Sequence, residues 1–168
     1  IREELLGQHG AIRGLLLAAE EAAGDALRAI TDGKGEVEEN TSHLRAHLLK
    51  LQEALELHNA REEGLLRGVI RRVDAWGDVR EMLMDAHHAG EHHSIISALD
   101  GTKESVGDRG AAAVREVQAI LGRLRAHIKE EEEKLLHPRV LTDDIVGGDA
   151  RQLAQSGDQP GHRASQFP

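Results

Sequence analysis

The 168-residue chain contains no cysteine. This excludes disulfide bonds, a cysteine nucleophile, and zinc or iron–sulfur sites that are held by thiolates. Aromatic residues make up only 1% of the chain, as Trp76 and Phe167, and tyrosine is absent. Because β-sandwiches and β-barrels rely on aromatic and β-branched side chains, this scarcity favours an all-α fold.

The sequence also lacks long apolar runs and an excess of basic residues. No apolar run is long enough to span a bilayer, and no secretory signal is visible. Asp and Glu number 30 against 21 for Lys and Arg, which gives a net charge of −9. We therefore expect a cytoplasmic protein whose partners are neither nucleic acids nor membranes.

Apolar periodicity predicts four helical segments. They run from Arg2 to about Ile30, from Val37 to about Arg72, from near Ala75 or Trp76 onward, and from after Gly110 to about Leu136. Asp108 is expected to cap the last helix, and Pro138 discourages its continuation. The sequence thus predicts a helical domain over residues 1–138, followed by a polar tail over 139–168.

Each segment carries a stripe of residues spaced three and four apart, which predicts its buried face. The stripes are apolar except where they hold His, or His with Glu. Their members are Leu5, His9, Ile12, Leu16 and Ala19; Leu44, Leu48, Leu51, Leu55, His58, Glu62 and Leu65; Met84, His88, His92, Ile95 and Leu99; and Val117, Ile120, Leu124, His127, Glu131 and Leu135. Since buried His and Glu without partners cost several kcal/mol, something must satisfy them.

A shared metal centre would satisfy them. Side chains four residues apart lie on one helix face, about 6 Å apart along the axis. The set comprises His9, His58, Glu62, His88, His92, His127 and Glu131. Five imidazoles and two carboxylates suit two iron ions, because the carboxylates can bridge the pair. Too few ligands remain to fill the coordination positions of both ions.

The helix register supports this set on one condition. Residue counts from the expected turns place the predicted ligands of the first, second and third helices at the same level along the bundle axis. His88 and His127 are level only if the third helix continues past Leu99, through Gly101, to about Ser105 or Val106. We therefore predict that extension.

This pattern resembles hemerythrins and the wider group of HHE cation-binding domains. The strings His58-Asn59-Ala60-Arg61-Glu62-Glu63 and His127-Ile128-Lys129-Glu130-Glu131-Glu132 are similar to the family's motifs, and the resemblance covers roughly residues 5 to 138. It implies an antiparallel up-down four-helix bundle with a metal site in its core.

The resemblance also implies a ligand arrangement. His88, His92 and His127 would hold one iron, while His9 and His58 would hold the other and leave it an open position. Glu62 and an acid on the fourth helix would bridge the irons, together with an oxo or hydroxo group.

Two points stay open in the sequence. Animal hemerythrins place the fourth-helix acid five residues after the His, here Glu132, whereas an undistorted helix favours Glu131. His87 and Glu91 form a competing pair, although stripe continuity favours His88 and His92, and Glu91 would then suit an acceptor for a ligand imidazole. His43 and His47 lie too far along the second helix to join, so we interpret them as a bundle-end or surface pair.

The leading functional expectation is a protein that binds or senses a small diatomic molecule such as dioxygen, with Ile12 and Leu124 walling the pocket. The alternatives are an enzyme that acts on peroxide, nitric oxide or ferrous iron, and an iron-level sensor. A ferritin-like di-iron protein would need Glu three residues before His, and no His in the chain has that neighbour.

Overall fold

The computed structural model describes residues 1–33, 36–70, 86–107 and 110–138, and the side chains of 66–70 and 86–89 fall outside that description. The described residues form four helices: α1 (Arg2–Asp32), α2 (Val37–Ile70), α4 (Ala86–Ser105) and α5 (Ala111–Lys134). None of these helices is both long enough and apolar enough to cross a membrane.

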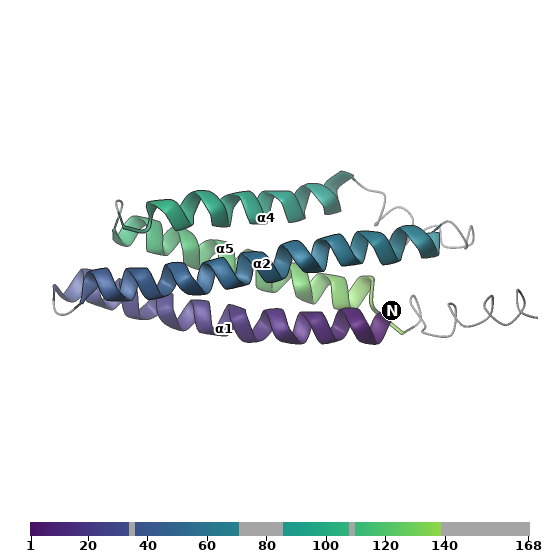
Figure 1. The fold of residues 1–168 in the computed structure, drawn as a ribbon, viewed down its shortest axis with the longest axis horizontal. Helices are drawn as coiled ribbons and strands as arrows, with labels where there is room; N and C mark the ends of the chain where they lie inside the picture. Colours follow the sequence, from purple (N-terminus) through teal and green to yellow (C-terminus); the bar gives the residue numbers. More distant parts are fainter. Residues whose placement is uncertain (34–35, 71–85, 108–109, 139–168) are drawn as a thin grey trace, which may run out of the picture.

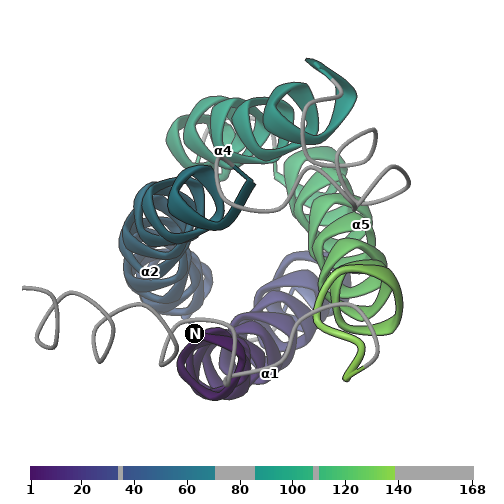
Figure 2. The same ribbon diagram turned by 90° about the vertical axis from the view of Figure 1, so that its right-hand side faces the viewer.

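The four helices form an antiparallel bundle. Successive helices run in opposite directions along the long axis, and the N-terminus lies at one end (Figure 1). Viewed along the axis, each helix occupies one corner, with α1 beside α2 and α5, and with α4 beside the same two helices (Figure 2). The predicted all-α, up-down four-helix bundle is confirmed.

Local sequence explains where α1 ends and α5 begins. Gly33 follows α1 with φ 60°, a left-handed conformation that glycine adopts without steric cost and that commonly closes helices. Gly110 is the N-cap residue of α5, with φ 56° and no side-chain capping bond. Asp108, which the sequence predicted as the cap, lies outside the described residues, and Gly110 occupies the N-cap position in its place.

The third helix passes well beyond Leu99, as the register argument predicted. α4 includes Gly101 and ends at Ser105, whose hydroxyl donates to the carbonyl of Gly101. The expected start of this helix near Ala75 or Trp76 lies outside the described residues, and so does the tail over 139–168.

The predicted stripes form the core. All members on α1 and α5 are buried, and so are those on α2 except Leu65, which is half-buried. On α4, His92, Ile95 and Leu99 are buried, while Met84 and the side chain of His88 lie outside the description. Each fully buried leucine contributes about 1.5–3 kcal/mol, so this interior holds the helices in register.

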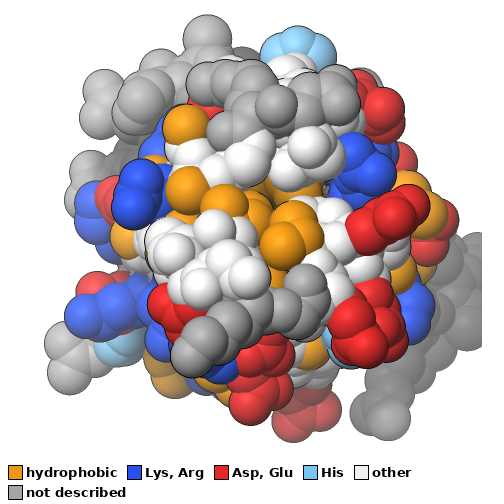
Figure 3. All heavy atoms as spheres, turned by 90° about the vertical axis from the view of Figure 1, so that its left-hand side faces the viewer, with side chains coloured by type: hydrophobic (Ala, Val, Ile, Leu, Met, Phe, Trp, Pro, Cys, Tyr) orange, Lys and Arg blue, Asp and Glu red, His pale blue; other side chains and the backbone are white. Residues whose placement is uncertain are grey.

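Apolar packing dominates the bundle from its middle to the end opposite the N-terminus. There α1 contributes small buried side chains, among them Ala19, Ala23 and Ala26, against larger residues such as Leu44 and Leu48. At that end face, hydrophobic side chains lie in the middle and charged side chains surround them (Figure 3). The buried His and Glu residues lie toward the other half of the bundle, which contains the N-terminus.

Candidate metal centre

Every helix contributes to one buried polar cluster. Its members are His9 from α1, His58 and Glu62 from α2, His92 from α4, and His127 and Glu131 from α5. None of the six exposes more than 8% of its surface. Each interrupts an apolar stripe, so helix packing itself carries these polar groups into the core.

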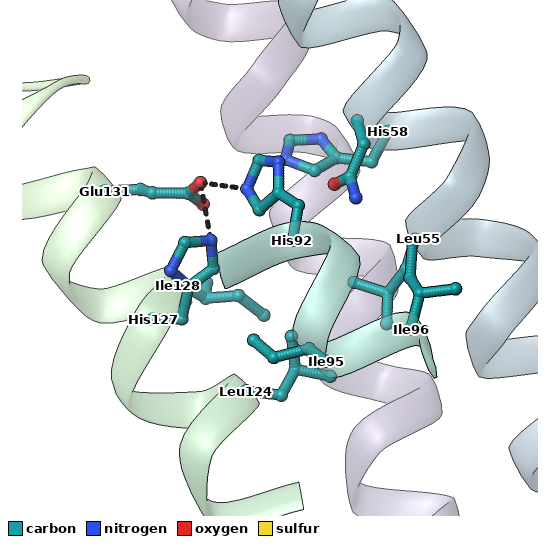
Figure 4. Close-up of a pocket in the computed structure, with 10 residues that line it drawn as sticks. Leu55, His58, His92, Ile95, Ile96, Leu124, His127, Ile128 and Glu131 are labelled. Atoms are coloured by element: carbon teal, nitrogen blue, oxygen red, sulfur yellow. Dashed lines mark hydrogen bonds and ion pairs between the residues drawn. The ribbon is translucent and has the colours of Figure 1, made fainter. Parts of the chain in front are cut away.

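Glu131 lies at the centre of the cluster. Its Oε1 atom is 2.9 Å from Nε2 of His127 and 3.0 Å from Nε2 of His92 (Figure 4). Its Oε2 atom is 3.2 Å from Nε2 of His9. One carboxylate therefore contacts imidazoles from three different helices.

The donor atoms fall into two groups of three that share Glu131. His9, His58 and Glu131 form one group, and His92, His127 and Glu131 form the other, with the ligand atoms of each group within 4.8 Å of one another. Glu62 lies between the groups, because its Oε2 atom is 3.9 Å from Nε2 of His58 and 3.7 Å from Nε2 of His92. This arrangement offers two adjacent cation positions with carboxylates between them.

The outward-facing ring nitrogens also have partners. Nδ1 of His9 lies 3.1 Å from Oε1 of Glu132, and Nδ1 of His58 lies 2.9 Å from Oε1 of Gln8. Nδ1 of His127 lies 3.4 Å from a carboxylate oxygen of Glu91. Acceptors at Nδ1 keep the hydrogen there and direct the Nε2 lone pair inward, as in metal-binding histidines.

The inward-facing nitrogens lie close enough to one another and to Glu131 to share a cation. Nε2 of His9 and Nε2 of His58 face each other at 3.2 Å, and Glu131 is the same distance from the former. Each of these short contacts needs a hydrogen on Nε2, and a metal ion that binds the cluster would take the place of those hydrogens. Imidazole and carboxylate together suit iron and other first-row metal ions, so the donor set fits a metal.

Burial and hydrogen bonds within the cluster shift the pKa values of its members. Burial opposes ionisation of Glu131, but hydrogen bonds with His127, His9 and His92 outweigh it and hold the pKa of that carboxyl far below its usual range. Burial likewise disfavours a charged ring at His127, yet the bond to Glu131 raises its pKa. At His58 burial prevails and lowers the pKa.

An apolar cavity adjoins the cluster. It has a volume of about 10 Å³, enough for about one water-sized molecule, and it touches His58, His92, His127 and Glu131 (Figure 4). Its other walls are mainly aliphatic: Leu55, Ile95, Ile96, Leu124 and Ile128. Leu124 thus walls the cavity as expected, whereas Ile12 belongs to the apolar core instead.

The structure brings together six of the seven residues predicted as ligands. The seventh, His88, lies on α4 one turn before His92, but its side chain is outside the described residues. His43 is exposed and His47 half-buried, with ring centroids 4.8 Å apart, which agrees with a pair outside the centre. Gln8 was missed, and its only signal in the sequence is its place beside His9.

Comparison with protein families gives one match. The model of the hemerythrin HHE cation-binding domain matches residues 1–137. Comparison with curated proteins gave no significant match, and neither did comparison with solved structures. Domains of this family bind metal cations, and the buried His and Glu groups of this chain fit such a site. The chain belongs to the hemerythrin HHE cation-binding domain family.

Proposed function

We propose that this chain is a cytoplasmic, non-haem di-iron protein that binds or senses dioxygen or a similar small diatomic molecule. The observation that carries the proposal is a carboxylate, Glu131, shared by two adjacent buried donor groups beside an apolar cavity. A single metal ion would leave one of these two groups without a cation.

The proposed ligands divide between the two positions. His9 and His58 hold one iron, and His92 and His127, with His88 from the preceding turn of α4, hold the other. Glu131 bridges the two positions, and Glu62, which lies within 4 Å of an imidazole from each group, is the second bridge. The position with only two imidazoles keeps room for an exogenous ligand.

When bound, the iron pair supplies the electrons that make binding of dioxygen reversible. The chain's own residues provide the surroundings. The carboxylates neutralise the metal charge, and the Nδ1 partners of His9, His58 and His127 keep the rings oriented. The aliphatic walls around the cavity exclude bulk water, and the small volume limits the ligand to about one or two heavy atoms.

Anaerobic reconstitution with ferrous iron tests this function. We expect about two irons per chain and an optical change on adding oxygen that reverses when the oxygen is removed. Zinc alone after iron supplementation, or one metal ion per chain, would contradict the di-iron centre. Addition of peroxide to a second sample separates binding from catalysis, because rapid turnover of peroxide would favour an enzyme over a binding protein.

A further inference from the structure

The two histidines of one donor group are supported in different ways. Behind His9, Nδ1 meets the carboxylate of Glu132 at 3.1 Å. Behind His58, Nδ1 meets the neutral amide oxygen of Gln8 at 2.9 Å. The group that His9 and His58 form with Glu131 therefore has one charged and one uncharged outer partner.

Glu132 is fixed as well as charged. The guanidinium of Arg13, one helical turn after His9 on α1, forms an ion pair with the other oxygen of this carboxylate. Partial burial opposes ionisation, but the bonds from Arg13 and His9 outweigh it and lower the pKa of Glu132. The side chain of Glu132 is 22% exposed and that of Arg13 is 47% exposed, so Arg13 holds the carboxylate from the surface of the bundle.

We propose that Glu132, held by Arg13, is a positioning residue for His9 that strengthens iron binding selectively at the position formed by His9, His58 and Glu131. The inference rests on the proposed di-iron function. It also separates two neighbouring acids on α5: Glu131 faces the metals, while Glu132 acts through His9.

The selectivity follows from the contacts. An ionised carboxylate that accepts the Nδ1 hydrogen keeps the ring in one tautomer and increases electron density at Nε2, whereas an amide mainly does the former. In the other group, Nδ1 of His127 lies 3.4 Å from a carboxylate oxygen of Glu91, a longer contact than the 3.1 Å between His9 and Glu132. Removing the charge of Glu132 therefore weakens one iron position and spares the other.

Anaerobic titration of the whole chain with ferrous iron against a competing chelator tests the inference. In Glu132→Gln we expect one of the two irons to bind about 10–100-fold more weakly and the other as in the original chain. Glu133→Gln is the matched control, because Glu133 is an exposed neighbour paired with Lys129, and it should leave both affinities unchanged. Unchanged affinities in Glu132→Gln, or equal losses at both positions, would overturn the proposal.

Two further variants exclude a merely structural role. Arg13→Met leaves the carboxylate but frees it, so we expect a smaller loss at the same position. Gln8→Glu, added to Glu132→Gln, puts a carboxylate behind His58 of the same group and should restore part of the lost affinity. If Glu132 only ties α1 to α5, both Arg13→Met and Glu132→Gln will lower the melting temperature of the metal-free protein and leave iron binding intact, which refutes the proposal.

The iron content of the original chain distinguishes failure of the proposed function from failure of the proposed role of Glu132. If it does not take up two irons, the proposed function fails. If it does, and Glu132→Gln binds them equally well, the function stands and only the role of Glu132 fails.

Discussion

At the scale of single residues, Glu131 has the most contacts with the proposed ligands. It belongs to both donor groups, so Glu131→Gln removes a charged ligand atom from each. Substitution of a residue that hydrogen-bonds to a metal ligand typically weakens metal binding by up to about 100-fold. We expect Glu131→Gln to weaken the binding of both irons by more than that. Iron analysis after desalting, together with chelator competition, measures the loss.

The neighbouring Glu130 offers a matched control for that variant. It is exposed and forms an ion pair with Lys134 on the surface of α5. Glu130→Gln should therefore retain both irons. Retention of two irons by Glu131→Gln, with the affinity of the original chain, would disprove its bridging role.

The proton on His127 makes iron binding depend on pH. Burial disfavours the charged ring, but the bond to Glu131 outweighs it and raises the pKa of His127, so the metal-free protein keeps that proton to higher pH than an ordinary histidine. Iron must displace the proton, so its affinity should rise with pH through the ordinary histidine range and level off only above the raised pKa of His127. Chelator competition across this range measures the effect, and a flat profile would contradict it.

At the scale of helices, the sequence predicted the described helices, their order along the chain and the face that each one buries. One face of each helix had to be apolar, so His58, Glu62, His127 and Glu131 stood out as polar interruptions. The extension of α4 to Ser105 followed from the same geometry, since the proposed ligands had to lie at one height.

Contacts between helices could not be predicted in the same way. Neighbouring acids on α5 point about 100° apart, so a single helix pattern shows that Glu131 and Glu132 face different surroundings. It does not show that Glu132 meets His9 and Arg13, because that depends on how α1 is rotated against α5. The role of Gln8 behind His58 depends on the rotation of α1 against α2 for the same reason.

Two glycines should respond to alanine in opposite directions. Gly101 lies exposed within α4, and an added Cβ would meet nothing within 4 Å. Gly101→Ala should therefore raise the free energy of unfolding by about 0.5–1 kcal/mol, through lower backbone entropy of the unfolded chain. Gly33 has φ 60°, so Gly33→Ala should cost about 1–2 kcal/mol. Chemical denaturation of both variants tests the pair, and a stabilising Gly33→Ala would contradict the left-handed cap.

At the scale of the whole molecule, the two halves of the bundle along its long axis differ in what they bury. One half is packed almost entirely by Ala, Leu, Val and Ile. The half that contains the N-terminus buries imidazoles and carboxylates among its aliphatic side chains. Arg2 closes that end by donating from Nε to the carbonyl of Leu136, 2.7 Å away, and so joins the start of α1 to the segment after α5. Metal binding is therefore expected to act on the half that contains the N-terminus.

Iron should stabilise the fold through the polar half. A metal that binds the folded chain and not the unfolded one adds about 2.7 kcal/mol when its free concentration is about 100 times its dissociation constant. For a chain of this size that corresponds to a rise of about 5–10 °C in melting temperature for each iron bound. Thermal melts of metal-free and anaerobically iron-loaded protein measure the rise. Glu131→Gln, which disrupts both positions, should show little of it. Identical melts for verified metal-free and two-iron protein would contradict stabilisation of the fold by iron.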